Sequence, residues 1–228
     1  MMNAKQITEI RLSKNLEQRI AAELLGVSQP YLSLLESGKR KLTRELAEKV
    51  VKVYELPPEK LPLAEDWEDL AEMNNDEIAE TIAGLGYPKF SHLQKGKQIN
   101  PAQILFSALK KDDLDSRIAE SLLWLVYTFY ELDWDKLTKY AKIFDLQNRL
   151  GFVVNLARQM AEKIGDDGKV AALSAVEMNL EKSRLLKEDV LANESITNAE
   201  RTFLKTNRSR QAKFWRVLSD LSVENLDI

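Results

Sequence analysis

Apolar side chains recur at helical spacing along most of the chain. Ile7 and Ile10 mark a helix near the beginning, because residues three or four positions apart share one face of a helix. The most apolar segments come later, at positions 114–129 and 150–160. Alternation of apolar and polar residues, which is typical of a half-buried strand, is missing over any useful length. The pattern therefore predicts an all-α protein.

Capping and breaking residues indicate where the later helices begin and end. Asn100 followed by Pro101 is a start signal, because the first helical turn does not need the N–H that proline lacks. Asp133 can cap another helix through its carboxylate. Beyond the first 65 residues, helices are predicted around 78–85, 101–109, 114–129, 134–144, 148–163, 170–187 and, as one or two elements, within 199–221. A loop at 87–98 and a turn at 165–168 separate some of them.

Residues 11–38 have the pattern of two short helices joined by a tight turn. Gln18–Leu25 is the first helix, the turn is at Gly26, and Ser28 can cap the second helix through its hydroxyl. Gly38 can end that helix in a left-handed conformation. Two short helices joined by a turn that contains glycine have the shape of a helix-turn-helix.

The second of these helices has an inward face and an outward face. Leu32 and Leu35 lie three positions apart and point inward together. Pro30 is tolerated because N–H groups in the first turn have no partner within the helix. The outward positions are Gln29, Pro30, Ser33, Leu34 and Ser37.

At these residues the chain resembles the DNA-binding domain of the lambda-repressor and Cro type, the xenobiotic-response-element family of bacterial and phage regulators. The resemblance covers roughly residues 4–63 and departs from the family at Glu17, where a Ser or Thr cap is usual, and at Ala21, where a larger apolar residue is usual. The matching residues are Arg11, Leu16, Gln18, Ala22, Leu25, Gly26, Val27, Ser28, Leu32, Ser33, Glu36 and Gly38. The resemblance implies a five-helix domain whose fifth short helix lies near residues 59–63.

The resemblance also implies which side chains meet DNA. Base contacts fall at Gln29, Pro30, Ser33 and Leu34, the first residues of the second helix to reach the major groove. Gln can pair with two edges of adenine, and Leu or Pro can pack on a thymine methyl. Leu34 has an alternative role, which is packing on the fourth helix or on the second domain.

Phosphate contacts are expected beside this second helix, which is the recognition helix of the family. Their candidates are Gln18, Tyr31, Lys39, Arg40, Lys41 and Arg44. The cations among them have the alternative role of a solvated loop. Arg11 and Glu36 form an ion pair in the family, and we interpret them as structural, because an Arg–carboxylate pair can be bidentate.

The distribution of charge supports two domains with different roles. Residues 1–65 hold 11 Lys and Arg against 9 Asp and Glu, whereas residues 66–133 hold 6 against 13, in a chain of net charge −3. A mildly basic head followed by an acidic middle suits a protein that touches DNA with one end only. We expect a DNA-binding domain at 1–65 and a larger helical domain, for dimerisation or partner binding, at 66–228.

Residues suited to catalysis or metal binding are scarce. His92 is the one histidine and the chain has no cysteine, so the usual His and Cys metal sites are not available. The acidic pairs at 112–113 and 166–167 fall at helix ends, where capping explains them. Gly84 and Gly86 lack the rest of a phosphate-binding loop. We expect no enzyme activity and no cofactor.

The same features predict a cytoplasmic protein. The absence of cysteine fits a reducing compartment. The beginning of the chain has no apolar signal core, and the longest apolar run, around residues 122–130, is too short to span a bilayer.

Two stretches of the second domain stand out. Residues 132–152 resemble a segment of antitoxins from abortive-infection systems, whose partners are nucleotidyltransferase-like toxins. Residues 201–219 hold six cations and three aromatic residues, with no acidic residue. The aromatic residues at helical spacing indicate core and the cations a solvated face; the other interpretation is a patch that touches DNA flanks or an acidic partner.

Taken together, these observations predict a dimeric, sequence-specific regulator of transcription, most simply a repressor, with double-stranded DNA as its partner. The alternative is an antitoxin that neutralises a toxin protein and regulates its own operon through the helix-turn-helix.

Overall fold

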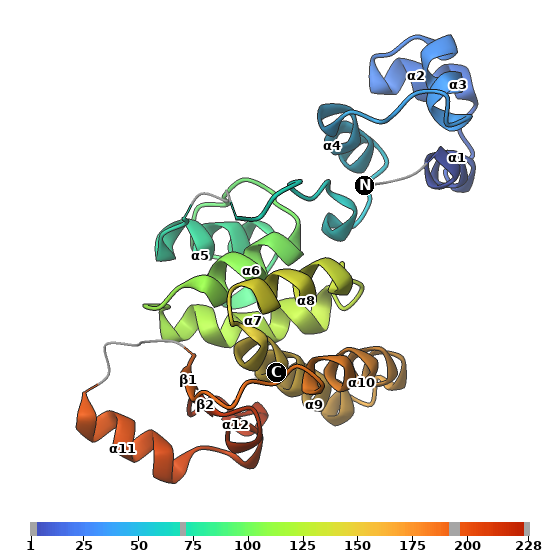
Figure 1. The fold of residues 1–228 in the computed structure, drawn as a ribbon. Helices are drawn as coiled ribbons and strands as arrows, with labels where there is room; N and C mark the ends of the chain where they lie inside the picture. The colour runs from blue at the N-terminus through green and yellow to red at the C-terminus, as the bar shows by residue number, and fades with distance from the viewer. Residues whose placement is uncertain (1–3, 69–71, 192–196, 226–228) are drawn as a thin grey trace. The chain divides into compact units, whose positions relative to one another are not determined.

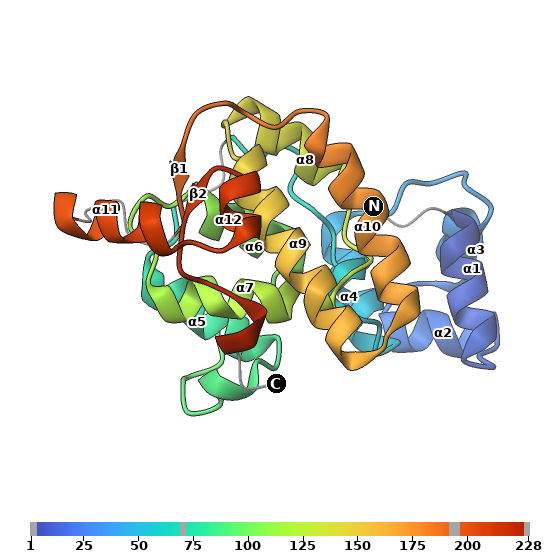
Figure 2. The ribbon, with the colours of Figure 1, turned by 90° about the horizontal axis from the view of Figure 1, so that it is seen from below.

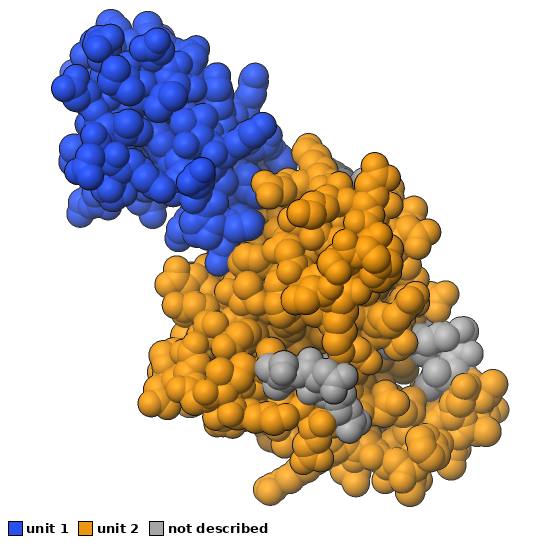
Figure 3. Space-filling model, turned by 180° about the vertical axis from the view of Figure 1, so that it is seen from behind, with its two compact units in different colours: residues 1–65 blue, residues 66–228 orange. Residues whose placement is uncertain are grey.

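The computed structural model describes residues 4–68, 72–191 and 197–225. The chain divides into two compact units, residues 1–65 and residues 66–228 (Figure 3). Both units are mostly helical, which confirms the predicted all-α fold (Figure 1). Within the described ranges, no helix is long and apolar enough to cross a membrane.

The first unit is built from four short α-helices and a 3-10 turn. In chain order these elements are α1 (Ala4–Ser13), α2 (Gln18–Leu25), α3 (Gln29–Glu36), α4 (Arg44–Val53) and η1 (Pro58–Lys60). The last element replaces the expected fifth helix near 59–63. Leu61 is extended, with ψ 142°, because Pro62 disfavours the helical conformation in the residue before it.

Local capping explains where two of these helices begin. The hydroxyl of Ser28 accepts a hydrogen bond from the N–H of Tyr31 at 3.3 Å, and that of Thr43 accepts from the N–H of Leu46 at 3.3 Å. α2 has no side-chain cap, because Glu17 precedes it and makes no capping bond.

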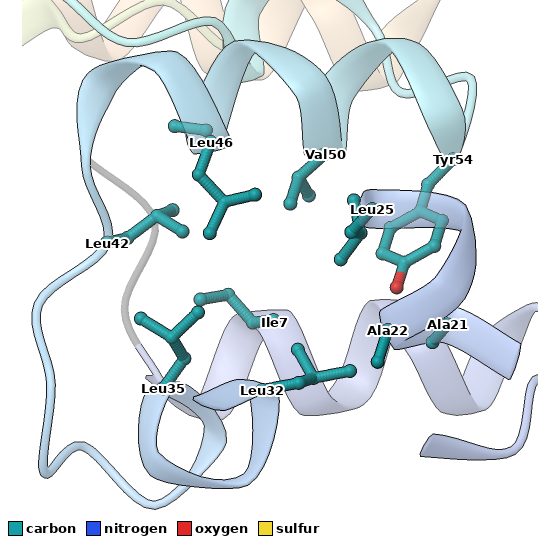
Figure 4. Close-up of a cluster of buried hydrophobic side chains, with 11 residues drawn as sticks. Ile7, Ala21, Ala22, Leu25, Leu32, Leu35, Leu42, Leu46, Val50 and Tyr54 are labelled. Atoms are coloured by element: carbon teal, nitrogen blue, oxygen red, sulfur yellow. The ribbon is translucent and has the colours of Figure 1, made fainter. Parts of the chain in front are cut away.

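The core of the first unit lies between α1, α2, α3 and α4. Figure 4 shows its side chains directed toward one another from these helices. The buried residues are Ile7, Ala21, Ala22, Leu25, Leu32, Leu35, Leu42, Leu46, Ala47, Val50 and Tyr54. Leu32 and Leu35 are both within it, so the inward face predicted for the recognition helix is the buried one.

The second unit is a larger helical assembly. Its α-helices are α5 (Asn75–Gly84), α6 (Pro101–Lys110), α7 (Ser116–Thr128), α8 (Trp134–Ile143), α9 (Gln147–Ile164), α10 (Asp167–Glu181), α11 (Asn198–Asn207) and α12 (Arg210–Phe214). Its shorter elements are η2 (Pro88–Phe90), β1 (Asp189–Val190), β2 (Val217–Leu218) and η3 (Val223–Asn225).

Helix α9 is the centre of the second unit. All its residues from Gln147 to Ala157 are buried, because α7, α8, α10 and α12 pack around it (Figures 1 and 2). The two most apolar segments, at 114–129 and 150–160, form the core of this unit, which explains their composition.

The segment after α10 departs from the predicted helix. The prediction continued this helix to residue 187, but it ends at Glu181. Asn148 explains the difference, because its side-chain oxygen accepts from the N–H of Leu185 and its amide donates to the carbonyls of Leu185 and Lys187. These backbone groups cannot then take part in a helix. At the other end, Asp166 caps the helix by accepting from the N–H of Lys169, so the helix begins inside the predicted turn.

A short parallel ladder joins β1 to β2, although the sequence predicts no strand. Asp189 pairs with Val217 and Val190 with Leu218. Each strand has two residues, which is too short for alternation to be recognised in a sequence. We call residues 182–191 and 197–225, which surround this ladder, the C-terminal lobe.

Two contacts anchor the C-terminal lobe to α9. Trp215 is fully buried against Gly151, where no Cβ intervenes. The buried guanidinium of Arg149 donates to Asp189 at 2.9 Å. Three aromatic residues of this lobe are predicted to be core. Trp215 is buried, whereas Phe203 and Phe214 are 62% and 43% exposed. Phe203 lies on α11, a helix with no buried residue, and that part of the prediction is wrong.

Candidate DNA interface

The solvent face of α3 carries the four residues predicted to contact bases. Gln29, Pro30, Ser33 and Leu34 are all exposed, and spacing places them on one side of the helix. Leu34 is 37% exposed, so its side chain is not enclosed by α4. The face therefore offers an amide, a hydroxyl and two apolar surfaces, which are the groups that read adenine and the thymine methyl in a major groove.

Three cations follow α3 in an exposed loop. Lys39, Arg40 and Lys41 all face solvent, and the N–H of Arg40 donates to the carbonyl of Leu34 at 3.1 Å. Gly38 permits the chain to turn here, because its φ of +72° lies in the left-handed region. This bond and this turn hold the start of the loop against the end of the recognition helix.

The other phosphate candidates are placed differently. Arg44 is exposed at the first turn of α4, where its Nε contacts Glu48 Oε1 at 3.2 Å in a solvated pair. Such an exposed pair is weak and can exchange for a phosphate. Tyr31 is half-buried and packs partly against the core of the first unit.

Gln18 has a structural contact that its predicted role as a phosphate ligand did not include. It begins α2, and its Nε2 donates to Glu36 Oε2 at 2.9 Å. This bond ties Gln18 to the Arg11–Glu36 ion pair. No sequence signal reveals the contact, because the two residues are 18 positions apart and meet only through packing.

Arg11 and Glu36 form a bidentate, largely buried ion pair. Nε and Nη2 of Arg11 lie 2.6 Å and 3.0 Å from the two carboxylate oxygens, and Nη1 donates to the carbonyl of Leu16 at 2.7 Å. The two side chains are 12% and 7% exposed. The pair joins α1 to the last residue of α3, so it fixes the recognition helix in the unit.

The ionisation of Glu36 follows from this geometry. Burial opposes its charge, but hydrogen bonds from Arg11 and Gln18, together with the charge of Arg11, outweigh burial and hold the pKa of Glu36 below its ordinary value. The hydrogen bonds that Arg11 donates to Glu36 likewise raise the pKa of Arg11. Burial, followed by the nearby charge of Glu36, raises the pKa of Tyr54. The carboxylate of Glu36 is therefore ionised throughout the physiological pH range.

The geometry of the first unit agrees with a family comparison. Residues 7–61 match the Helix-turn-helix family. This match confirms the predicted resemblance of the first unit to helix-turn-helix domains of the lambda-repressor and Cro type. Comparison of the chain with curated proteins and with solved structures gives no significant match.

The family match bears on the activity of the chain. Helix-turn-helix proteins of this type are DNA-binding regulators, and the match supports a DNA-binding regulator of transcription. The matched residues belong to the first unit, so the match makes no statement about the second.

Proposed function

We propose that the protein is a sequence-specific repressor of transcription that binds its operator as a dimer. The observation that carries this proposal is the exposed side of α3, where Gln29, Ser33 and Leu34 stand beside the cations of the 39–41 loop. Residues of α3 would contact the bases, and the cations of the loop would contact the phosphates, as in other domains of this class. A dimer is proposed because one recognition helix covers only part of a symmetric operator.

Substitutions on α3 should change sequence preference. We expect Gln29→Ala and Leu34→Ala each to reduce the preference for operator over random DNA by about 1–3 kcal/mol, because each removes a base contact. The two affinities should be measured at one salt concentration, on a fragment of the promoter of the gene itself and on a scrambled fragment.

The matched control is a cation of the adjacent loop. Lys41→Ala should weaken both kinds of DNA alike and lower the salt slope by about one, because a phosphate contact carries no sequence information. If the Leu34→Ala protein is less stable but keeps its preference for operator DNA, Leu34 has a packing role and does not contact a base.

Operator geometry tests the proposed dimer. Two half-sites with centres about 34 Å apart should be bound together, because this is one turn of B-DNA. Inserting roughly five base pairs, half of a turn, should separate the faces of the two half-sites and reduce affinity for the pair to that of one half-site. Equal affinities at all spacings would show that the sites are bound independently.

A second candidate function is that of an antitoxin. The observation that favours it is the large second unit, which lies outside the helix-turn-helix match and exposes Ile143, Met178 and Phe203. The stretch 132–152 that resembles antitoxins is mostly framework, since it covers α8 and the buried beginning of α9. Co-purification of the native protein followed by mass spectrometry tests this candidate, and recovery of a toxin in fixed stoichiometry would favour it.

A further inference from the structure

The C-terminal lobe carries a surplus of positive charge in a chain that is acidic as a whole. Its residues include nine Lys and Arg against five Asp and Glu, whereas the net charge of the chain is −3. The cations are Lys182, Arg184, Lys187, Arg201, Lys205, Arg208, Arg210, Lys213 and Arg216. The helix-turn-helix domain does not include any of them, so the proposed operator contacts leave this charge unexplained.

Contacts within the unit already engage three of the carboxylates of the lobe. Glu188 contacts Lys205 at 3.2 Å and Arg208 at 3.0 Å. Asp189 binds the buried Arg149, and Glu200 completes the cap of α11 with Thr197. Six other cations of the lobe have no carboxylate of the described residues within ion-pair distance. These cations are Lys182, Lys187, Arg201, Arg210, Lys213 and Arg216.

The ladder brings these unpaired cations into one part of the molecule. The N–H of Asp189 donates to the carbonyl of Arg216 at 2.9 Å, so the strand that follows Lys187 runs beside Arg216. Arg184 reaches α12, where it donates to the carbonyl of Phe214 at 2.7 Å. Glu188 holds α11 to the same ladder, and α11 lies at the margin of the unit in both ribbon views (Figures 1 and 2).

We propose that the C-terminal lobe is a second DNA contact, which binds the phosphate backbone of duplex DNA beside the operator. The inference rests on the proposed function of the first unit, because it assumes that DNA is already the partner. Unpaired, exposed Lys and Arg side chains are the groups that neutralise phosphates and release counterions. Contacts of this kind add affinity without adding sequence preference.

The composition of the surface favours phosphate over an acidic protein. The centre of a protein interface is typically apolar and depleted in lysine. In the lobe, the exposed large apolar side chains include Phe203, Phe214 and Leu186, and the guanidinium of Arg184 lies over one face of the Phe214 ring, 4.2 Å from its centroid. Phe203 is two positions from Lys205, which places it on the other side of α11 from the contact between Lys205 and Glu188. The lobe has six cations without a carboxylate partner against three exposed large apolar side chains, and this composition fits the phosphate backbone.

Neutralising three of the unpaired cations in the full chain tests the inference. The variant carries Lys187→Gln, Arg210→Gln and Lys213→Gln, all of them exposed side chains. Its affinity for a random duplex of roughly 60 base pairs, several helical turns long, is measured over a series of salt concentrations. We expect the slope of log affinity against log salt to become shallower by about three, because each phosphate contact contributes about 0.9. Unchanged tryptophan fluorescence, to which the buried Trp215 contributes, checks that the lobe remains folded.

The matched control removes the same charge elsewhere in the second unit. Lys95→Gln, Lys97→Gln and Lys163→Gln change three exposed lysines outside the lobe and should leave the slope nearly unchanged. Equal slopes in the two triple variants would overturn the inference. If Gln29→Ala still reduces the preference for operator over random DNA in that case, the proposed function stands although the lobe contact fails.

Discussion

Glu36→Ala is expected to lower the free energy of unfolding of the first unit by about 3–5 kcal/mol, because it leaves the buried guanidinium of Arg11 without its carboxylate. Arg11 would keep its bond to the carbonyl of Leu16, and Gln18 would lose its acceptor. The recognition helix would also lose its link to α1, so DNA binding should fall with the folded fraction of the domain.

The positions of the tryptophans make this effect measurable in the full chain. All four, Trp67, Trp124, Trp134 and Trp215, belong to the second unit. Glu36→Ala should therefore lower the midpoint of an early transition in circular dichroism and leave the tryptophan fluorescence transition in place. A shift of both transitions together would show that the two units unfold as one.

An exposed ion pair on α1 is the matched control. Glu9 contacts Lys5 at 3.6 Å, with side chains 61% and 85% exposed. Glu9→Ala should cost less than about 1 kcal/mol, because solvent screens such a pair. Replacing Arg11 and Glu36 together by apolar residues should recover part of the loss, and a double variant that is no better than Glu36→Ala would exclude the orphaned charge as its cause.

The lowered pKa of Glu36 predicts how the first unit responds to pH. The stabilisation from this group is complete above its unfolded pKa, about 4.3, and is lost as the pH falls through the lower folded value. Glu36→Gln should therefore remove part of the acid dependence of the first transition and leave that of the second unchanged.

Trp215→Ala is expected to destabilise the second unit by about 3–5 kcal/mol, because it empties a site in which the indole is fully buried. The indole lies on α9 at Gly151, so its loss should release the C-terminal lobe before the helical core unfolds. At a temperature where the core remains helical, the variant should also lose the salt-dependent DNA contact proposed for the lobe.

Gly151→Ala tests the same contact from the other side. A Cβ at Gly151 would lie 2.2 Å from Cζ3 of Trp215, far inside van der Waals contact. The gain in helix propensity, about 1 kcal/mol, is smaller than the cost of overpacking, about 1–3 kcal/mol or more, so the variant should be destabilised.

A second glycine controls for helix propensity. Gly168 lies in α10 with only Asp166 Oδ1 near its Cβ position, at 3.6 Å, so Gly168→Ala should be neutral or stabilising. Combining Gly151→Ala with Trp215→Leu should cost less than the sum of the two changes, because the smaller side chain leaves room for the methyl group. Strict additivity would mean that the two residues do not press on each other.

Local signals in the sequence determined much of this protein. Ser28, Thr43 and Asp133 cap helices in the structure, and α2 has the predicted bounds Gln18–Leu25. These features involve neighbours in the chain, so the residue types alone indicate them. The helix-turn-helix was recognised for the same reason, because its turn and its two faces are local patterns.

Contacts between residues far apart in the chain come from packing, and the sequence pattern does not predict them. Gln18 meets Glu36, Asn148 takes the backbone groups that would have continued α10, and Gly151 receives Trp215. The exposure of Phe203 is of the same kind, because it depends on whether another element covers α11. Periodicity shows which side chains share a face of a helix, but what that face meets is set by packing, which no local pattern records.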